Sequence, residues 1–154
     1  MKQIQVGMLL ACMIMGSCGS DNNDSGDSSN TQNSTSSITN TQARIFFEQP
    51  KDGAVVTSPV TFQFSATGVT VEQAGEVKPN AGHFHVLIDN ALGYIPKGQT
   101  IPADDKHVHF GDGGKEGTVD LPAGEHKLTL QFGNGQHQSA GKELSHTISI
   151  TVKE

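Results

Sequence analysis

Sulfur-containing side chains are nearly missing from this sequence, and the few present stand at its beginning. The 154 residues include two cysteines, Cys12 and Cys18, and four methionines, of which Met15 is the last. The chain after Cys18 therefore offers no disulfide, although an exported domain would meet an oxidising compartment. It also offers no thiol or thioether ligand, which excludes blue-copper centres and soft Cu(I) sites.

Aromatic and basic side chains are also scarce. Tryptophan is absent, tyrosine occurs once, and aromatic residues make up 5% of the chain. A sugar-binding platform usually relies on tyrosine or tryptophan, so this sequence argues against one. The formal net charge is −6 and no basic arm or patch stands out, so we expect no nucleic-acid partner.

The first 17 residues have the pattern of a signal peptide. Lys2 precedes an uncharged apolar run, 6–15, which is shorter than the roughly 20 residues that span a bilayer. A positive start, a short apolar core and small residues after it are typical of a secretory signal. The segment MGSC resembles the bacterial lipobox, in which the cysteine is acylated and becomes the N-terminus. We therefore predict cleavage before Cys18 and lipid on that residue. The alternative is an ordinary signal that leaves Cys18 as a free thiol.

Residues 18–42 are predicted to be the lipidated cysteine and a disordered linker. After Cys18 this segment consists almost wholly of Ser, Asn, Asp, Thr, Gly and Gln, and such a composition cannot bury enough apolar surface to fold. Acyl chains on Cys18 would anchor the protein to a membrane. Gly19, not aspartate, follows the cysteine, which resembles outer-membrane sorting in Gram-negative bacteria. We expect an exported, membrane-anchored lipoprotein, on the outer membrane or periplasmic face in a Gram-negative host.

Residues 43–154 are predicted to form one domain of β-strands. Apolar and polar residues alternate strictly in three segments, 60–66, 128–132 and 148–152, as is typical of half-buried strands. Clusters of Gly, Pro, Asn and Asp, which favour turns, separate further candidate strands at 45–48, 69–73, 83–88, 107–110 and 118–121. About seven or eight short strands with no helical pattern predict an all-β fold, an immunoglobulin-like antiparallel β-sandwich. The Cys…Trp…Cys signature of true immunoglobulin domains is absent.

All seven histidines lie in this domain, and four of them form two His-X-His pairs. Residues i and i+2 of a strand point to the same face. His83 and His85 should therefore face outward together, opposite the apolar Phe84, and His107 and His109 should do the same. If the two segments are neighbours on one sheet, four imidazoles converge. The alternative is that these histidines are scattered, solvated and inert.

The other three histidines have different expected roles. His137 lies in the loop GNGQHQSAG and is free to reach a site at the same end of the sandwich. His126 is in register with the apolar Leu128, so it is either a histidine at the core edge or a ligand. His146 is in register with Ile148, which favours a structural role. The predicted metal ligands are His83, His85, His107, His109, His137 and His126.

Imidazoles without sulfur favour Zn²⁺ or Cu²⁺, because Cu(I) prefers softer ligands. Asp89 and either Asp104 or Asp105 could supply a carboxylate or orient an imidazole. We expect an envelope protein that binds a divalent transition metal for scavenging, delivery or buffering. The main alternative is a metal-free immunoglobulin-like module for binding or adhesion.

An enzyme is the least favoured class. The glycine-rich GDGGKEG precedes no helix, so it is a turn and not a phosphate-binding loop. No nucleophile-elbow pattern occurs. HFH and HVH resemble the histidine pairs of copper–zinc superoxide dismutase, but the disulfide expected in that family is missing.

Five motifs follow one another between Gly82 and Val152: GHFHVLID, IPADDKHVHFGDGGKE, LPAGEHKLTLQF, GNGQH and TISITV. In this order they resemble the motifs of DUF4399, a secreted bacterial family of unknown function. Phe84 stands where the family has a further histidine, and His146 stands where it has glutamate. The resemblance implies that the histidines form a unit, but it implies no activity. The positions it carries over are His83, His85, Asp89, His107, His109, Gly111, His126 and His137.

Overall fold

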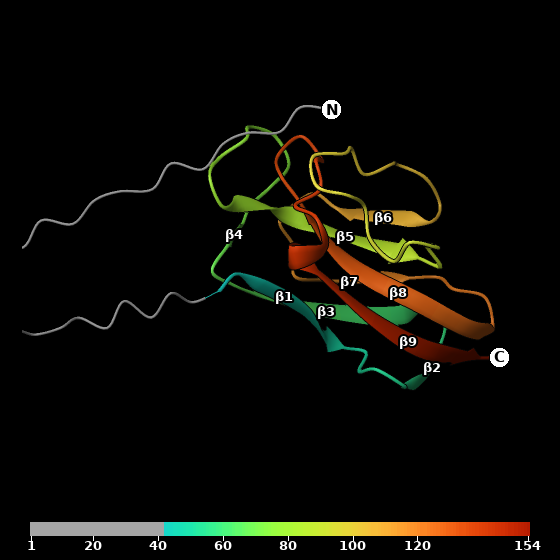
Figure 1. The fold of residues 1–154 in the computed structure, drawn as a ribbon. Helices are drawn as coiled ribbons and strands as arrows, with labels where there is room; N and C mark the ends of the chain where they lie inside the picture. The colour runs from blue at the N-terminus through green and yellow to red at the C-terminus, as the bar shows by residue number, and fades with distance from the viewer. Residues whose placement is uncertain (1–41) are drawn as a thin grey trace, which may run out of the picture. The chain divides into compact units, whose positions relative to one another are not determined.

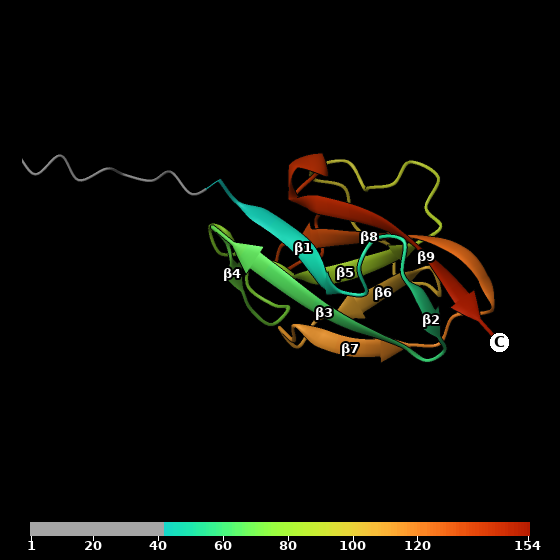
Figure 2. The same ribbon diagram turned by 90° about the horizontal axis from the view of Figure 1, so that it is seen from below.

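The computed structural model describes residues 42–154, which form two packed β-sheets (Figures 1 and 2). The smaller sheet has the order β1 (Arg44–Gln49), β3 (Val60–Thr67), β7 (Glu116–Val119). The larger sheet has the order β2 (Val55–Thr57), β9 (Ser145–Lys153), β8 (Gly124–Gly133), β5 (Ala81–Ile88), β4 (Thr70–Val71), and β6 (His107–Phe110) also pairs with β5. The only helical segment within residues 42–154 is one 3₁₀ turn, η1 (Lys142–Leu144).

The predicted signal peptide, Cys18 and nearly all of the predicted linker lie outside the described residues. No helix within the described part of the chain is both long enough and apolar enough to cross a membrane.

The hydrophobic core lies between the two sheets, where the alternating apolar residues of each sheet meet. Figure 2 shows β1, β3 and β7 covering one face of the larger sheet. The buried core residues are Ile45, Phe47, Val60, Phe62, Phe64, Phe84, Val86, Ile88, Leu121, Leu128, Leu130, Phe132, Ile148, Ile150 and Val152. Since the segments with period-two alternation all contribute this face, the predicted all-β, immunoglobulin-like sandwich is confirmed.

Two short strand pairs depart from the antiparallel pattern. β2 runs parallel to β9, and β4 runs parallel to the beginning of β5. β2 was not predicted, because three residues are too few to show a period. The strand expected at 69–73 is reduced to the two residues of β4.

The central strand β5 is buried on both faces, and all eight of its residues are buried. Phe84, Val86 and Ile88 enter the core between the sheets. The opposite face carries His83, His85 and Leu87, and these too are buried. Hence a second layer of chain covers the outer face of the larger sheet at β5.

Candidate metal centre

Two segments cover the outer face of β5 and enclose its histidines. Figure 1 shows the yellow segment between β5 and β6 on the side of the larger sheet away from β1 and β3. Its Ile95 N–H donates to Oε1 of Gln131 in β8, and its Ile101 N–H donates to the carbonyl oxygen of His137. Ile101 is buried against this face. The segment therefore packs as a lid onto the sheet and onto the loop after β8.

The prediction that His83 and His85 lie on the face away from the core is confirmed, but this face is not open to solvent. Both side chains lie opposite the core face, as the period of two required, but they are 0% and 1% exposed. The reason is the covering layer, which the alternation within β5 cannot reveal. A buried imidazole needs a partner for its polar nitrogens. The burial of His83 and His85 therefore rules out the alternative that these two histidines are solvated and inert.

Four histidine rings converge beneath and beside this layer. The pairing of β5 with β6 places His85 directly opposite His109, and the loop after β8 brings in His137. The Nε2 atoms of His83 and His85 are 3.0 Å apart, and those of His109 and His137 are 3.1 Å apart. His83, His109 and His137 each offer one ligand nitrogen, and these three atoms lie within 4.8 Å of one another.

The spacing of the four rings matches that of imidazoles around a single ion. All six pairs of ring centroids among His83, His85, His109 and His137 are 4.7–5.7 Å apart. Nitrogen ligands at 2.0–2.1 Å from a tetrahedral Zn²⁺ would be about 3.3 Å apart, and their ring centroids roughly 5 Å apart. The four histidines could thus share one ion with small movements of their side chains.

The loop that carries His137 is fixed by its own hydrogen bonds. The side-chain oxygen of Asn134 accepts from the N–H groups of Gln136 and Gln138, and the backbone carbonyl of Asn134 accepts from His137. His137 has a φ of 64°, a left-handed conformation that is uncommon for a residue with a side chain. Such strain gathers at functional sites, where the surrounding structure maintains it. The sequence suggested a loop free to reach the site, whereas the structure holds the ring against His109.

Two glycines, which have no side chain, provide the space that the rings of His109 and His85 occupy. A Cβ atom at Gly111 would overlap the ring of His109. A Cβ atom at Gly133 would lie 3.0 Å from Nε2 of His85. Gly111 is one of the positions that the family resemblance carried over, while Gly133 was missed. The only sequence feature that could have indicated Gly133 is its place directly after an alternating strand, and a glycine there is equally typical of an ordinary turn.

We expect Gly111→Ala to weaken metal binding while leaving the fold intact. The added methyl group would displace the solvent-exposed ring of His109, and the core does not depend on that ring. Changes around a ligand typically cost about 10–100-fold in affinity, so a loss of this size is expected in a Zn²⁺ titration. Gly114→Ala is the matched control, because its Cβ would meet the exposed carboxylate of Asp112 at 2.8 Å. Equal affinities of the two variants would show that the His109 position is unimportant.

Burial keeps the inner rings neutral. Burial, together with repulsion from His109 and His137, lowers the pKa of His83 from 6.5 to about 4. Burial, together with repulsion from His83 and the other nearby rings, lowers the pKa of His85 to about 3. The pKa of His109 is lowered by burial and by His137. Neutral imidazole is the form that binds a metal, so the inner rings are in a form that could hold a cation near pH 7.

His107 lies on the same face but outside the convergent group. It stands opposite Leu87 in the β5–β6 pair. Its Nδ1 atom is 2.7 Å from Oδ1 of Asp104, while its Nε2 atom is buried without a hydrogen-bond partner. The hydrogen bond from His107 lowers the pKa of the Asp104 carboxyl. Of the two neighbouring aspartates in the sequence, Asp104 is thus the one that orients an imidazole.

The structure does not bring His126 to the other histidines. It lies near the opposite end of β8 and pairs with Ile150, on the face of the core. Its Nδ1 atom is 2.9 Å from Oδ2 of Asp89, and its Nε2 atom is 3.0 Å from the carbonyl oxygen of Pro122. Burial lowers the pKa of His126, but these two acceptors outweigh burial and the pKa is raised. With both nitrogens facing acceptors, the ring has no lone pair for an ion.

His146 has a structural place, as expected from its register. Its Nδ1 atom accepts a hydrogen bond from the Phe47 N–H at 3.3 Å, and its ring lies against the Phe47 ring. This position links β9 to β1 and is outside the histidine cluster.

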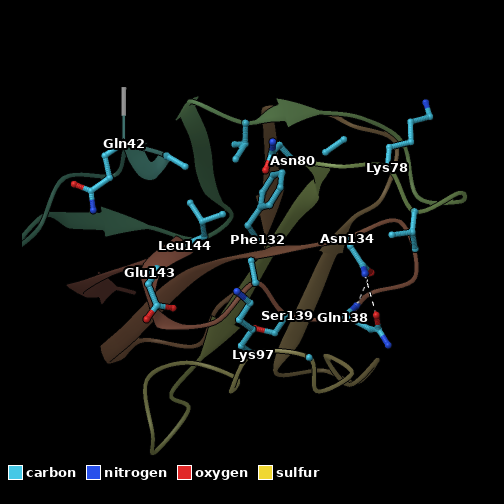
Figure 3. A pocket seen from close by; sticks show the side chains of 16 residues that line it. Gln42, Lys78, Asn80, Lys97, Phe132, Asn134, Gln138, Ser139, Glu143 and Leu144 are labelled. Atoms are coloured by element: carbon cyan, nitrogen blue, oxygen red, sulfur yellow. Dashed lines mark hydrogen bonds between the residues drawn. The ribbon is translucent and has the colours of Figure 1, made fainter. Parts of the chain in front are cut away.

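A cavity of about 670 Å³ lies beside the loop that carries His137. Figure 3 shows Phe132 at its centre, with Lys97 and Glu143 on one wall and Asn134 and Gln138 on another. Nδ2 of Asn134 donates to Oε1 of Gln138 at 3.0 Å. No histidine lines the cavity. The cavity and the histidine cluster are therefore separate features that share one loop.

Comparison with known proteins identifies the family of this chain but indicates no activity. The chain matches no curated protein and no solved structure significantly. Residues 62–153 match the family model described as Domain of unknown function (DUF4399). This range holds all seven histidines together with β5, β6 and the loop after β8. Because the match covers more than half of the sequence, the chain belongs to the DUF4399 family.

Proposed function

We propose that this domain binds a divalent transition metal ion through His83, His109 and His137, with His85 as a fourth nearby imidazole. The observation that carries the proposal is the convergence of ligand nitrogens from β5, β6 and one loop to within 4.8 Å. Clustered groups of suitable chemistry are the proper basis for a functional argument. The fold alone would support many functions.

Burial and access support the same conclusion. His83 and His85 are inaccessible, whereas His109 is exposed and His137 is half-buried. An ion could therefore enter from the side of His109 and reach the neutral inner rings. A centre that is held by rigid strands on one side and open on the other suits uptake and release, as scavenging, delivery or buffering requires.

The donor set favours Zn²⁺ or Cu²⁺. All candidate ligands are imidazoles, which suit both ions, while Ca²⁺ and Mg²⁺ prefer oxygen. The spacing of the four rings fits a tetrahedral Zn²⁺ ion after small movements of their side chains. Cu²⁺ prefers a tetragonal arrangement, which would require a rotation of the exposed His109 or His137.

Elemental analysis of protein isolated from its native envelope tests this proposal. We expect at least one equivalent of zinc or copper per chain, and tight uptake of at least one equivalent when stripped protein is titrated with either ion. The competing metal-free binding module would contain no stoichiometric metal and would take up none tightly. That second result would overturn the proposed function.

We further propose that the domain is displayed as a membrane-anchored lipoprotein, on the basis of MGSC after the apolar run at 6–15. Mature protein should begin at a diacylated Cys18, and mass spectrometry of the N-terminal peptide measures this. Cys18→Ser should be recovered without lipid, because the thiol that accepts it is gone. An unmodified Cys18 in the wild type, or cleavage at another residue, would refute the anchor. Neither result would bear on metal binding by the domain.

A further inference from the structure

Three buried ring nitrogens in and beside the histidine cluster have no hydrogen-bond partner. They are Nδ1 of His83, Nδ1 of His85 and Nε2 of His107. A buried polar atom without a hydrogen bond is uncommon in proteins, and an ion or an ordered water is a frequent explanation. All three rings belong to the covered face of the larger sheet, so ordinary solvent does not satisfy them.

The Asp104 carboxylate determines which nitrogen of His107 carries the lone pair. The carboxylate only accepts hydrogen bonds, so Nδ1 of His107, 2.7 Å from Oδ1 of Asp104, carries the proton. In the neutral ring Nε2 is then unprotonated and faces the buried side. A histidine that donates one N–H to a carboxylate while its other nitrogen binds a metal is a common arrangement in metalloproteins.

The strand register brings His107 within reach of His85. Leu87 is opposite His107, and His85 is opposite His109, so His85 and His107 are diagonal neighbours on one face. Such neighbours are about 7–8 Å apart and long side chains can bridge them. Nε2 of His85 lies 3.0 Å from Nε2 of His83. With the proton on Nε2, Nδ1 of His85 holds the lone pair, and binding of the first ion by His83 replaces the contact between the two Nε2 atoms.

We propose that Nδ1 of His85 and Nε2 of His107 bind a second divalent transition ion next to the first, with Asp104 as the positioning residue. This inference rests on the proposed function, because the ring of His85 lies between the two positions. The first ion retains His83, His109 and His137 as its ligands. The second ion has two protein ligands and completes its coordination with solvent, so it binds more weakly than the first.

Titration of metal-stripped protein with Zn²⁺ tests the second position. We expect two binding steps in the wild type, with His107→Ala removing the weaker step and leaving the tighter one unchanged. Asp104→Ala should weaken the second step by roughly 10-fold or more, as outer partners of ligands do. Asp104 is half-exposed, so this variant should fold. His146→Ala, which alters a histidine outside both positions, should keep both steps.

The same titration with Cu²⁺ provides an independent readout. Two neighbouring Cu²⁺ ions broaden each other's electron paramagnetic resonance signal, and this broadening should appear at the second equivalent and be absent in His107→Ala. One step in every protein, with no broadening, would overturn the second position and leave the proposed function standing. No binding step in the wild type would overturn both.

Discussion

Zn²⁺ affinity is expected to fall by roughly 100-fold or more when His109 and His137 are both replaced by alanine. Even changes to the outer partners of metal ligands cost about 10–100-fold, and this double variant removes two ligands outright. Both rings lie at the accessible side of the centre, so their loss should leave the hydrophobic core and the fold intact. Competition with a chelator at pH 7 measures the change.

His146→Ala and His126→Ala are the controls for this double variant. Both replace a histidine in the same domain, yet His146 contacts Phe47 and His126 pairs with Asp89. Each control should retain the affinity of the wild type. If the controls and the double variant lose affinity equally, binding reflects general histidine content and not the cluster.

The ion-free protein is expected to lose several kcal/mol of stability as the pH falls from 6.5 toward 4. Burial holds the pKa of His83 at about 4 and that of His85 at about 3, whereas the unfolded chain has the ordinary value of about 6.5. The unfolded state therefore binds more protons in this window, and the free energy of unfolding falls with pH. One pKa unit corresponds to about 1.36 kcal/mol, so the loss is large against a typical total of about 5–15 kcal/mol.

Urea unfolding of stripped protein at several pH values measures this loss. Data above about pH 4.5 isolate the histidines, since Asp89 and Asp104 have pKa values lowered from 3.8 and stay ionised there. A variant with His83 and His85 both changed to asparagine should show a flatter profile. A wild-type profile that is already flat between pH 6.5 and 4.5 would contradict the burial of neutral rings.

His126 provides a control of opposite sign. Its pKa is raised by Asp89 and Pro122 against the effect of burial. It therefore stabilises the protein fully below the unfolded value of about 6.5, and this contribution is lost as the pH rises through its folded pKa. His126→Gln should therefore remove a gain in stability that the wild type shows as the pH falls toward 6.5. It should leave the slope below pH 6.5 unchanged, in contrast to the flatter profile of the β5 variant.

The sandwich itself could be predicted because its core obeys a period of two. Val60, Phe62 and Phe64 alternate with polar residues in the sequence and enter the core in the structure. The same rule assigned His83 and His85 to the face opposite Phe84. The sequence did not predict β2 or the short length of β4. Strands of two or three residues show no period, and they depend on the neighbouring strands that pair with them.

The environment of the histidines could not be predicted, because alternation says which face a side chain takes and not what covers it. The covering segment shows no strand pattern, and its Ile95 and Ile101 become meaningful only when they contact β8 and the loop of His137. The hydrogen-bond partners of the two aspartates could not be predicted for the same reason. Asp89 and Asp104 were candidates for orienting imidazoles, but the sequence could not match Asp89 to His126 or Asp104 to His107.

Anomalous diffraction at the zinc edge, from crystals of the domain grown with Zn²⁺, locates the bound ion directly. We expect a peak among the rings of His83, His109 and His137, with Zn–N distances of about 2.0–2.1 Å. We also expect the peak to disappear in the variant lacking His109 and His137. Zinc found only at surface carboxylates, with the four rings keeping their mutual hydrogen bonds, would contradict the proposed metal site.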